Sequence, residues 1–372
     1  MSRTRDEDAC PGALSVHQAA DGMLARIRVP GGMITPAQLE ALAETSLEFA
    51  AGTLELTGRG NLQLRGITDT TAVAEVVAAV GLLPSPGHET VRNIVASPLS
   101  GRLGGLADIR AWVGELDRAI CAEPALTGLS GRFLFSLDDG TGDVSGLAAD
   151  AGVQVLPDDS LALLLAGRDT GVRLTRDEAI PALVTVARRF TEIRGKVWRV
   201  NELADPDALL DGMTRGETTL TVTPVTSPPV GWIEQDDGSV TLGAAVPLGV
   251  LTARQAQFVA AIDKPVVITP WRSLLICDLD DGVADTALRV LAPMGLVFDE
   301  NSRWLEVSAC AGSPGCERSH ADVRSEAARA VAFGEGSGRV HYVGCERACG
   351  KPVAGQVMVA TGTGYERLAG RP

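Results

Sequence analysis

The order of apolar and polar positions repeats once along the chain, which predicts an internal duplication. The first series contains the strand-like LARIRVP at 24–30, the helix-like ITPAQLEALAE at 34–44 and the strand-like LELTGRGNLQLRGI at 54–67. The second series is VTLGAAVPLGVLTARQAQFVAAI at 240–262, followed by VVITPWRSLLICDL at 266–279. We therefore expect two copies of a strand–helix–strand–strand unit.

Each predicted helix begins after a threonine whose hydroxyl can accept a hydrogen bond from the first turn. These residues, Thr35 and Thr252, are 217 positions apart. In the first helix Leu39, Leu42 and Leu47 are apolar residues at helical spacing.

A second pair of matching segments follows in each half. The first half has NIVASPLSG at 93–101 and GRFLFSLDDGTGD at 131–143, and the second has VSACAGSPGC at 307–316 and GRVHYVGCERACGKP at 338–352. Each predicts a strand that runs into a loop, with a helical stretch between the two strands. Only the second half carries cysteines in these loops, so we expect one active centre in a duplicated protein. A Thr/Pro-rich stretch at 214–229 predicts the linker between the halves.

Charge narrows the range of partners. The 372 residues include 33 Lys and Arg against 47 Asp and Glu, a net charge of −14. Such a surface repels nucleic acid and anionic membranes, so an anionic ligand needs a local basic pocket. The charged amino terminus lacks the apolar core of a signal peptide, and no run approaches the roughly 18 apolar residues of a membrane span. We expect a cytoplasmic protein that binds neither nucleic acid nor membrane.

Four of the seven cysteines gather near the carboxyl end as C-x5-C and C-x3-C. Zinc sites usually use tighter C-x2-C knuckles, whereas an iron–sulfur cluster is larger and tolerates wider spacing with glycines nearby. The pattern favours a 4Fe–4S cluster, with structural zinc or four unrelated thiols as alternatives. We expect His320 and His341 to be structural and Cys121 and Cys277 to be buried, and the role of Cys10 stays open.

These motifs resemble the sirohaem-type nitrite and sulfite reductase superfamily. The resemblance rests on C-x5-C followed by C-x3-C, on TGRGNLQLRGI, on VRN before a strand and on the duplicated halves. It implies an α+β fold with a pseudo-twofold: two ferredoxin-like half-domains and two cluster-type α/β domains. The implied boundaries are 1–85 and 214–300 for the half-domains, with the linker in the latter, and 86–213 and 301–372 for the α/β domains, of which only the last holds a cluster.

The resemblance also implies roles for individual residues. The cluster ligands would be Cys310, Cys316, Cys345 and Cys349. Cys349 matches the ligand that also bridges to the macrocycle iron in the reductases. Arg59 and Arg92 match arginines at the tetrapyrrole and the substrate anion, which agrees with the bidentate pairing of guanidinium and carboxylate groups. Strand alternation places Arg59, Asn61, Gln63 and Arg65 on one face, where we expect them to bind the tetrapyrrole.

One departure from the reductases directs the functional hypothesis. The reductases carry two basic residues, with one residue between them, near the strand that here reads GRFLF. In this chain Arg132 keeps the first basic position, but Leu134 occupies the second. Loss of this cation weakens the binding of a small oxyanion. Within the superfamily, ACPGALSVHQAADGMLARIRVPGG with LTGRGNLQLRG is most similar to the precorrin-3B synthases, the oxygen-using enzymes of aerobic cobalamin biosynthesis.

That resemblance implies a monooxygenase that hydroxylates precorrin-3A with O2 and forms a lactone. Electrons would pass through the 4Fe–4S cluster, and Arg59, Arg92 and Arg132 would hold substrate carboxylates at the catalytic site. A separate electron donor and a monomeric protein are expected, and a further iron or a sirohaem in the cavity stays open. The alternatives are a sirohaem-dependent nitrite or sulfite reductase, and a non-catalytic tetrapyrrole carrier or structural zinc protein.

Overall fold

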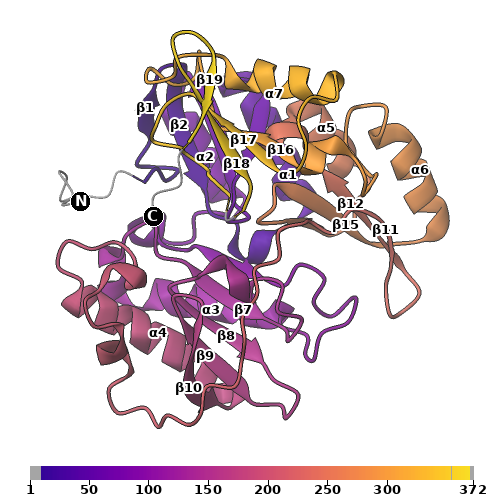
Figure 1. Ribbon diagram of the computed structural model, residues 1–372. Coiled ribbons are helices and arrows are strands. Elements are labelled where there is room, and N and C mark those ends of the chain that lie inside the picture. The colour runs from indigo at the N-terminus through magenta and orange to yellow at the C-terminus, as the bar shows by residue number, and fades with distance from the viewer. Residues whose placement is uncertain (1–9, 353, 369–372) are drawn as a thin grey trace.

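A computed structural model describes residues 10–352 and 354–368 of the chain. It has two lobes (Figure 1). One lobe holds the first α/β domain, and the other holds both ferredoxin-like half-domains together with the second α/β domain. The charged residues 1–9, on which the expectation about a signal peptide partly rests, lie outside the described part.

Two interlocked five-stranded sheets form the ferredoxin-like half-domains. The first has the order β1 (His17–Ala19), β2 (Gly22–Ile27), β5 (Leu62–Ile67), β4 (Thr53–Leu56), β13 (Val250–Thr252). The second has the order β11 (Gly231–Glu234), β12 (Val240–Ala245), β15 (Ser273–Leu279), β14 (Val266–Ile268), β3 (Met33–Ile34). Strands β13 and β3 therefore each pair with the sheet of the other half, so the two halves share one core.

The helices of the half-domains confirm the predicted repeat. They are α1 (Pro36–Phe49), α2 (Thr70–Ala79), α5 (Ala253–Ala260) and α6 (Asp281–Leu291). Helices α1 and α5 pack against each other, and each begins with a capping box, at Thr35 with Gln38 and at Thr252 with Gln255. Each box satisfies backbone N–H groups that a helix terminus leaves without an intrahelical partner.

One of the apolar residues at helical spacing in α1 lies outside the core. Leu39 and Leu42 are fully buried, but Leu47 is 57% exposed. The buried face of α1 continues through Ser46, whose hydroxyl donates to the carbonyl of Thr53 at 3.0 Å. Leu47 is one position farther, about 100° around the helix, and so it turns toward solvent.

The first α/β domain is a five-stranded sheet with a large core. Its order is β10 (Arg168–Leu174), β9 (Leu161–Leu165), β8 (Ala151–Val155), β7 (Phe135–Asp138), β6 (Ile94–Ala96), with helices α3 (Arg110–Ala122) and α4 (Arg176–Ile193). Strands β6, β7 and β8 run parallel. Strand β7 begins later than the GRFLF pattern predicts, because the N–H of Phe133 bonds to the carbonyl of Ser130 at 2.9 Å and closes a turn.

The second α/β domain is smaller. Its sheet has the order β16 (Val307–Ala309), β17 (Val340–Val343), β18 (Gln356–Ala360), β19 (Tyr365–Arg367), and one helix, α7 (Val323–Ala332), connects β16 to β17. The first three strands are parallel. As predicted for both α/β domains, a strand, a loop, a helix and a second strand follow one another.

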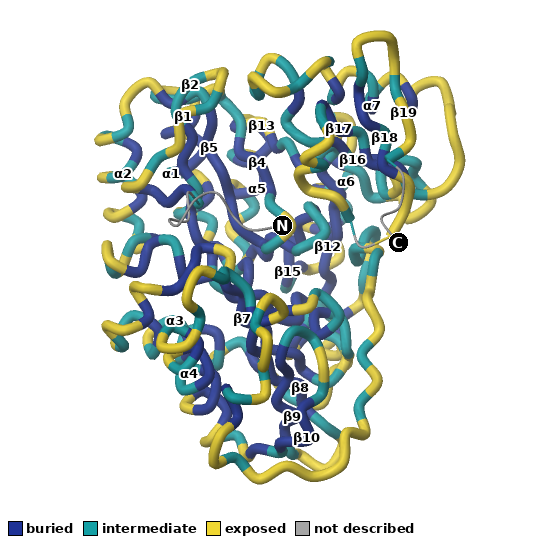
Figure 2. Tube along the Cα trace, turned by 60° about the vertical axis from the view of Figure 1, so that its left-hand side comes forward, coloured by how far each residue is buried: buried dark blue, intermediate teal, exposed yellow. Residues whose placement is uncertain are grey.

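Short 3₁₀ helices connect these elements at Pro30–Gly32, Pro86–His88, Pro124–Gly128, Ser145–Leu147, Val200–Glu202, Pro206–Leu210, Pro247–Gly249 and Arg303–Leu305. Figure 2 shows buried positions concentrated in the sheets and exposed positions in the loops. The Thr/Pro-rich stretch contains neither helix nor strand over 217–229. No described helix is long and apolar enough to cross a membrane.

Candidate active site

The two cysteine-bearing loops lie side by side because they follow neighbouring parallel strands. Strand β16 pairs with β17, with Ala309 opposite Tyr342, so the carboxyl ends of both strands meet at one edge. Cys310 and Cys316 lie in the loop after β16, and Cys345 and Cys349 in the loop after β17. The loops are joined directly, since the N–H of Gly344 lies 3.4 Å from the sulfur of Cys310 and the N–H of His320 donates to the carbonyl of Gly344 at 2.9 Å.

The four thiols form one electrostatic group. Burial raises the pKa of the Cys349 thiol, and the neighbouring Cys310, Cys345 and Cys316 raise it further. The charges of neighbouring thiolates disfavour one another, so the four sulfurs share one local environment.

The spacing of the thiols fits a group larger than one ion. Thiolates around a tetrahedral zinc lie within roughly 4 Å of each other, because the Zn–S bond is about 2.3 Å. Within residues 10–352 and 354–368, the one trio whose ligand atoms all lie within 4.8 Å is Asp138, Asp139 and Asp143, and it includes no cysteine. Four cysteines at wider spacing, with a backbone N–H directed at one sulfur, suit the donor set of an iron–sulfur cluster.

His341 supports the cysteine loop from behind. It is completely buried, with Nδ1 2.8 Å from the hydroxyl of Ser308 and Nε2 2.9 Å from the carbonyl oxygen of Cys349. Burial lowers its pKa to about 4, so the imidazole is neutral at pH 7. Both ring nitrogens are engaged, which agrees with the predicted structural role.

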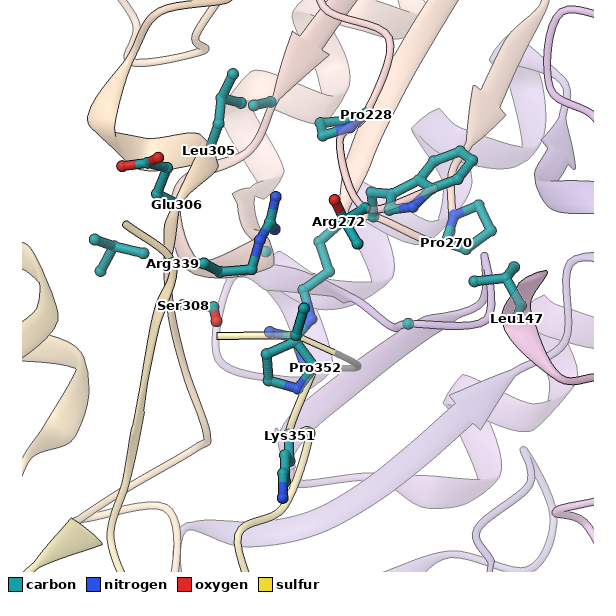
Figure 3. A pocket seen from close by; sticks show the side chains of 18 of the residues that line it. Leu147, Pro228, Pro270, Arg272, Leu305, Glu306, Ser308, Arg339, Lys351 and Pro352 are labelled. Carbon is teal, nitrogen blue, oxygen red and sulfur yellow. The ribbon is translucent and has the colours of Figure 1, made fainter. Parts of the chain in front are cut away.

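A cleft beside the thiols consists of two adjoining cavities. The cysteine cavity, about 360 Å³, is lined by Cys310 and Cys349. The tryptophan cavity, about 300 Å³, is lined by Trp271 and Trp304 and is shown in Figure 3. They meet at residues that line both, which we call the junction: Gly58, Arg59, Leu248, Gly249, Arg272 and Gly350.

The cleft is basic although the protein is acidic. Its walls carry eight basic side chains against two carboxylates, Glu55 and Glu306: Arg26, Arg59, Arg65, Arg199, Arg272, Arg324, Arg339 and Lys351. Some of these cations are ion-paired: Arg65 with Asp21, Arg324 with Glu55 and Arg199 with Asp150. An excess of positive charge remains for an anionic ligand.

The predicted polar face of β5 and its preceding turn lines the cysteine cavity. Arg59, Asn61, Gln63 and Arg65 are all among its lining residues, as strand alternation predicts. All four side chains also bond to other parts of the chain. Asn61 bonds to Val29 and Asn93, Gln63 lies between Arg26 and Glu55, and Arg65 bonds to Asp21 and to the carbonyl of Gly315 in a cysteine loop.

Arg59 is the member of this face that reaches both cavities. Its Nη1 donates to the carbonyl of Gly131 at 3.2 Å, and burial lowers its pKa to about 10, assisted by Arg199. Cys10, whose role the sequence left open, lies against Gly131 and is an electrostatic neighbour of Arg59. A guanidinium held this deeply favours an anionic partner.

Two other predicted arginines lie outside the cleft lining. Arg92 is buried, and its guanidinium bonds to both oxygens of Asp117 and to the carbonyl of Leu82. Arg132 is exposed and stacks over Trp198, with its guanidinium carbon 4.8 Å from the ring centroid. The turn before β7 directs Arg132 outward, whereas Leu134 lines the tryptophan cavity.

Sequence reasoning missed several lining residues, above all Arg272. A signal was present: at the 212-residue offset that relates Leu62 to Leu274, Arg272 corresponds to Gly60. A long side chain where the other copy has glycine indicates that the site differs between the halves. The expected burial of Cys277 is confirmed, but Cys121 is only half-buried, because it follows the buried Ile120 at the margin of the α3 core face.

Comparisons with known proteins agree with this architecture. A family model described as the nitrite/sulfite reductase ferredoxin-like half domain matches residues 16–80. Precorrin-3B synthase from Sinorhizobium sp. is 26% identical over 96% of this chain and 81% of its own length. Ferredoxin–nitrite reductase from Synechococcus elongatus is 33% identical over 32% of this chain, but only 25% of that enzyme is covered.

The structure of the Mycobacterium tuberculosis NirA protein has a TM-score of 0.75 to this chain, at 20% identity, and the match covers 93% of this chain and 73% of that one. The predicted α+β fold is therefore confirmed as that of the nitrite and sulfite reductases. The resemblance to precorrin-3B synthase within this superfamily is confirmed as well. The nitrite reductase matches part of this chain, whereas the precorrin-3B synthase matches nearly all of it.

Proposed function

We propose that this protein is an oxygen-dependent oxidoreductase of the precorrin-3B synthase type, with precorrin-3A as its substrate. The observation that carries the proposal is a basic cleft with an apolar wall directly beside four grouped thiols. The similarity to the Sinorhizobium synthase, which spans 81% of that enzyme, supports the choice within the superfamily.

The cleft suits a flat macrocycle with carboxylate arms. In the tryptophan cavity Leu134, Leu147 and Trp271 belong to one apolar cluster and form a wall that can contact a ring face. Arg59, Arg272 and the other cations can hold the roughly eight carboxylates of a uroporphyrinoid through charge-assisted hydrogen bonds. Leu134 is 4% exposed, so this wall also excludes water from the bound ring.

The reaction combines precorrin-3A, O2, two electrons and two protons. One oxygen atom enters a ring carbon as a hydroxyl group, a side-chain acetate closes a lactone, and the other oxygen atom leaves as water. Cys310, Cys316, Cys345 and Cys349 would hold the 4Fe–4S cluster, which supplies electrons from a separate donor protein. Cys310 and Cys349 line the cleft, so the cluster edge would face the substrate. The chain's own contribution is to orient the ring and keep water away.

The direct test is turnover with labelled oxygen. Anaerobically purified, iron-loaded protein is mixed with precorrin-3A and a chemical reductant and then exposed to ¹⁸O₂. We expect a product carrying one labelled oxygen atom, detected by mass spectrometry, and no such product from Cys345→Ser. Absence of any oxygenated product from the iron-loaded wild type would contradict the proposal.

A sirohaem-dependent nitrite or sulfite reductase is the second candidate. The 33% identity to the Synechococcus nitrite reductase and the NirA-like fold favour it. It requires cations that grip a small oxyanion, but Leu134 is apolar and Arg132 is directed away from the cleft. It predicts reduction of nitrite or sulfite by the purified protein, which the precorrin-3B synthase proposal does not.

A further inference from the structure

Two turns related by the duplication have the same backbone hydrogen bonds. In the first, the N–H of Thr57 donates to the carbonyl of Asn61 at 2.9 Å and that of Gly60 to Thr57 at 3.2 Å. In the second turn, at 269–273, the N–H of Thr269 donates to Ser273 at 2.9 Å and that of Arg272 to Thr269 at 3.2 Å. Arg272 therefore occupies the position of Gly60.

The position of Arg272 is one that glycine normally occupies. Gly60 has φ 66° and Arg272 has φ 59°, both in the left-handed region that disfavours residues with a Cβ. The same exchange occurs once more, since Gly31 has φ 62° and its counterpart Leu248 has φ 57°. Both of these strained side chains, Leu248 and Arg272, lie at the junction of the two cavities. Such strain is typically retained where a side chain serves a site.

The fold leaves room for the Arg272 side chain along its whole length. A Cβ on Gly249 would lie 2.9 Å from its Cδ, and a Cβ on Gly350 would lie 2.8 Å from its Nη2. The guanidinium thus ends against the residue that follows Cys349. Figure 3 shows the side chain crossing the cleft toward Pro352.

No hydrogen bond or ion pair joins the guanidinium of Arg272 to another residue in the described part of the chain. Glu55, a carboxylate whose charge acts on Arg272, is ion-paired with Arg324. The Arg272 side chain is half-buried, and this burial lowers its pKa. A ligand carboxylate would supply the missing acceptor.

We infer that Arg272 binds a carboxylate of the tetrapyrrole at the junction of the two cavities, beside Cys349. The identity of the ligand rests on the proposed function. Arg59, on the related turn of the first half, also lines the junction, so the two copies each present one guanidinium to the ligand. Bidentate pairing with carboxylates explains why arginine suits this place better than lysine.

The test substitutes glycine, which restores the first-half turn. Because glycine tolerates a left-handed backbone, we expect Arg272→Gly to fold at least as stably as the wild type. Its affinity for uroporphyrin III, an octacarboxylate measured by anaerobic fluorescence titration, should fall about 10- to 100-fold. Arg272→Lys should fall between the two. The matched control is Asp263→Gly, an exposed left-handed position (φ 56°) in the same half, for which the affinity should stay at the wild-type value.

The possible results distinguish a failure of the Arg272 inference from a failure of the proposed function. Wild-type affinity in Arg272→Gly would overturn this inference alone, and loss of iron and sulfide from that variant would assign Arg272 to support of the cysteine loop instead. If wild-type protein with full iron content fails to bind uroporphyrin III, both the inference and the proposed function fall.

Discussion

The two α/β domains share one plan but hold their loops in different ways. In each, a strand, a loop, a helix and a parallel strand precede a second loop. In the second domain that loop carries Cys345 and Cys349, and in the first it carries Asp139 and Asp143 at the same spacing. One copy thus presents thiols where the other presents carboxylates.

The carboxylate loop is satisfied by its own hydrogen bonds. Asp138 is buried and accepts from the N–H groups of Gly140, Gly142, Val144 and Ser145 at 2.8–3.2 Å. Ser97, at the end of β6, donates its hydroxyl to Asp143 at 2.6 Å. These contacts close the loop without any added group.

The hydrophobic cores of the two α/β domains also differ, because the first domain has much the larger core. Among the described residues, the core of the first domain contains 30 buried residues, whereas the two clusters of the second contain five and three. A core this small supplies little stability, so a group bound by the four cysteines would supply much of it. The comparison teaches that the domain whose loops carry the cysteines has the smaller core, so under the proposed function it would depend on the bound group for part of its stability.

The largest expected effect follows from removing one thiol. Cys345→Ser should lose most of its iron and sulfide, and amide hydrogen exchange should become fast in β16–β18 while β6–β9 stay protected. Cys121→Ser, outside both cysteine loops, should keep its iron. Equal protection of both domains from amide hydrogen exchange in the iron-free variant would contradict the inferred difference in their stability.

Removing the organising carboxylate should act on the first domain whether or not iron is bound. Asp138→Ala leaves four backbone N–H groups without their acceptor, so we expect a loss of about 3 kcal/mol in the free energy of unfolding by urea. The exposed Asp158→Ala should change it by less than about 0.5 kcal/mol. A loss seen only in iron-free protein would contradict the assignment.

The carboxylate loop should also make stability depend on pH. Burial and the charge of Asp138 raise the pKa of Asp143 from 3.8 to about 7. The folded protein therefore holds a proton that the unfolded chain releases, and the stabilisation is complete below about pH 4 and lost as the pH rises to about 7. Asp143→Asn should remove this dependence and gain on the order of 2 kcal/mol at pH 8. If the difference in unfolding free energy between wild type and variant, measured with urea, were the same at pH 5 and pH 8, this prediction would be refuted.

The smallest expected effect is the loss of unfolding free energy when either helix cap is removed. Thr35→Ala and Thr252→Ala should each cost about 1 kcal/mol in unfolding free energy, because each removes the acceptor in a capping box. Thr286→Ala, at an exposed position inside α6, should cost nothing because alanine favours helix. A clear loss in only one of the two caps would show that the copies no longer rely on the same device.

Local patterns account for what the sequence could predict. The duplicated unit, its capping threonines and the alternating face from Arg59 to Arg65 follow from spacing of 2.0 or 3.6 residues. The grouping of the four cysteines could be predicted because both loops follow strands of matching segments. Such local patterns carry no information on how one chain segment is placed against another.

Three residues show that limit. Arg92 and Arg132 could not be placed from sequence, since their partners, Asp117 and Trp198, are tens of residues away and on other elements. Arg272 reaches the cleft only because the two halves pack with their related turns at one junction. Tertiary packing, not local propensity, decides which arginines are free to bind.

The most direct measurement is an optical and EPR spectrum of anaerobically purified protein, with iron and sulfide quantified in the same sample. We expect broad iron–sulfur absorption without macrocycle bands, because under the proposed function the tetrapyrrole is a substrate and not a resident cofactor. Addition of uroporphyrin III should then saturate one site. Intense sirohaem bands that persist through purification would contradict the account and show that the macrocycle is a resident cofactor.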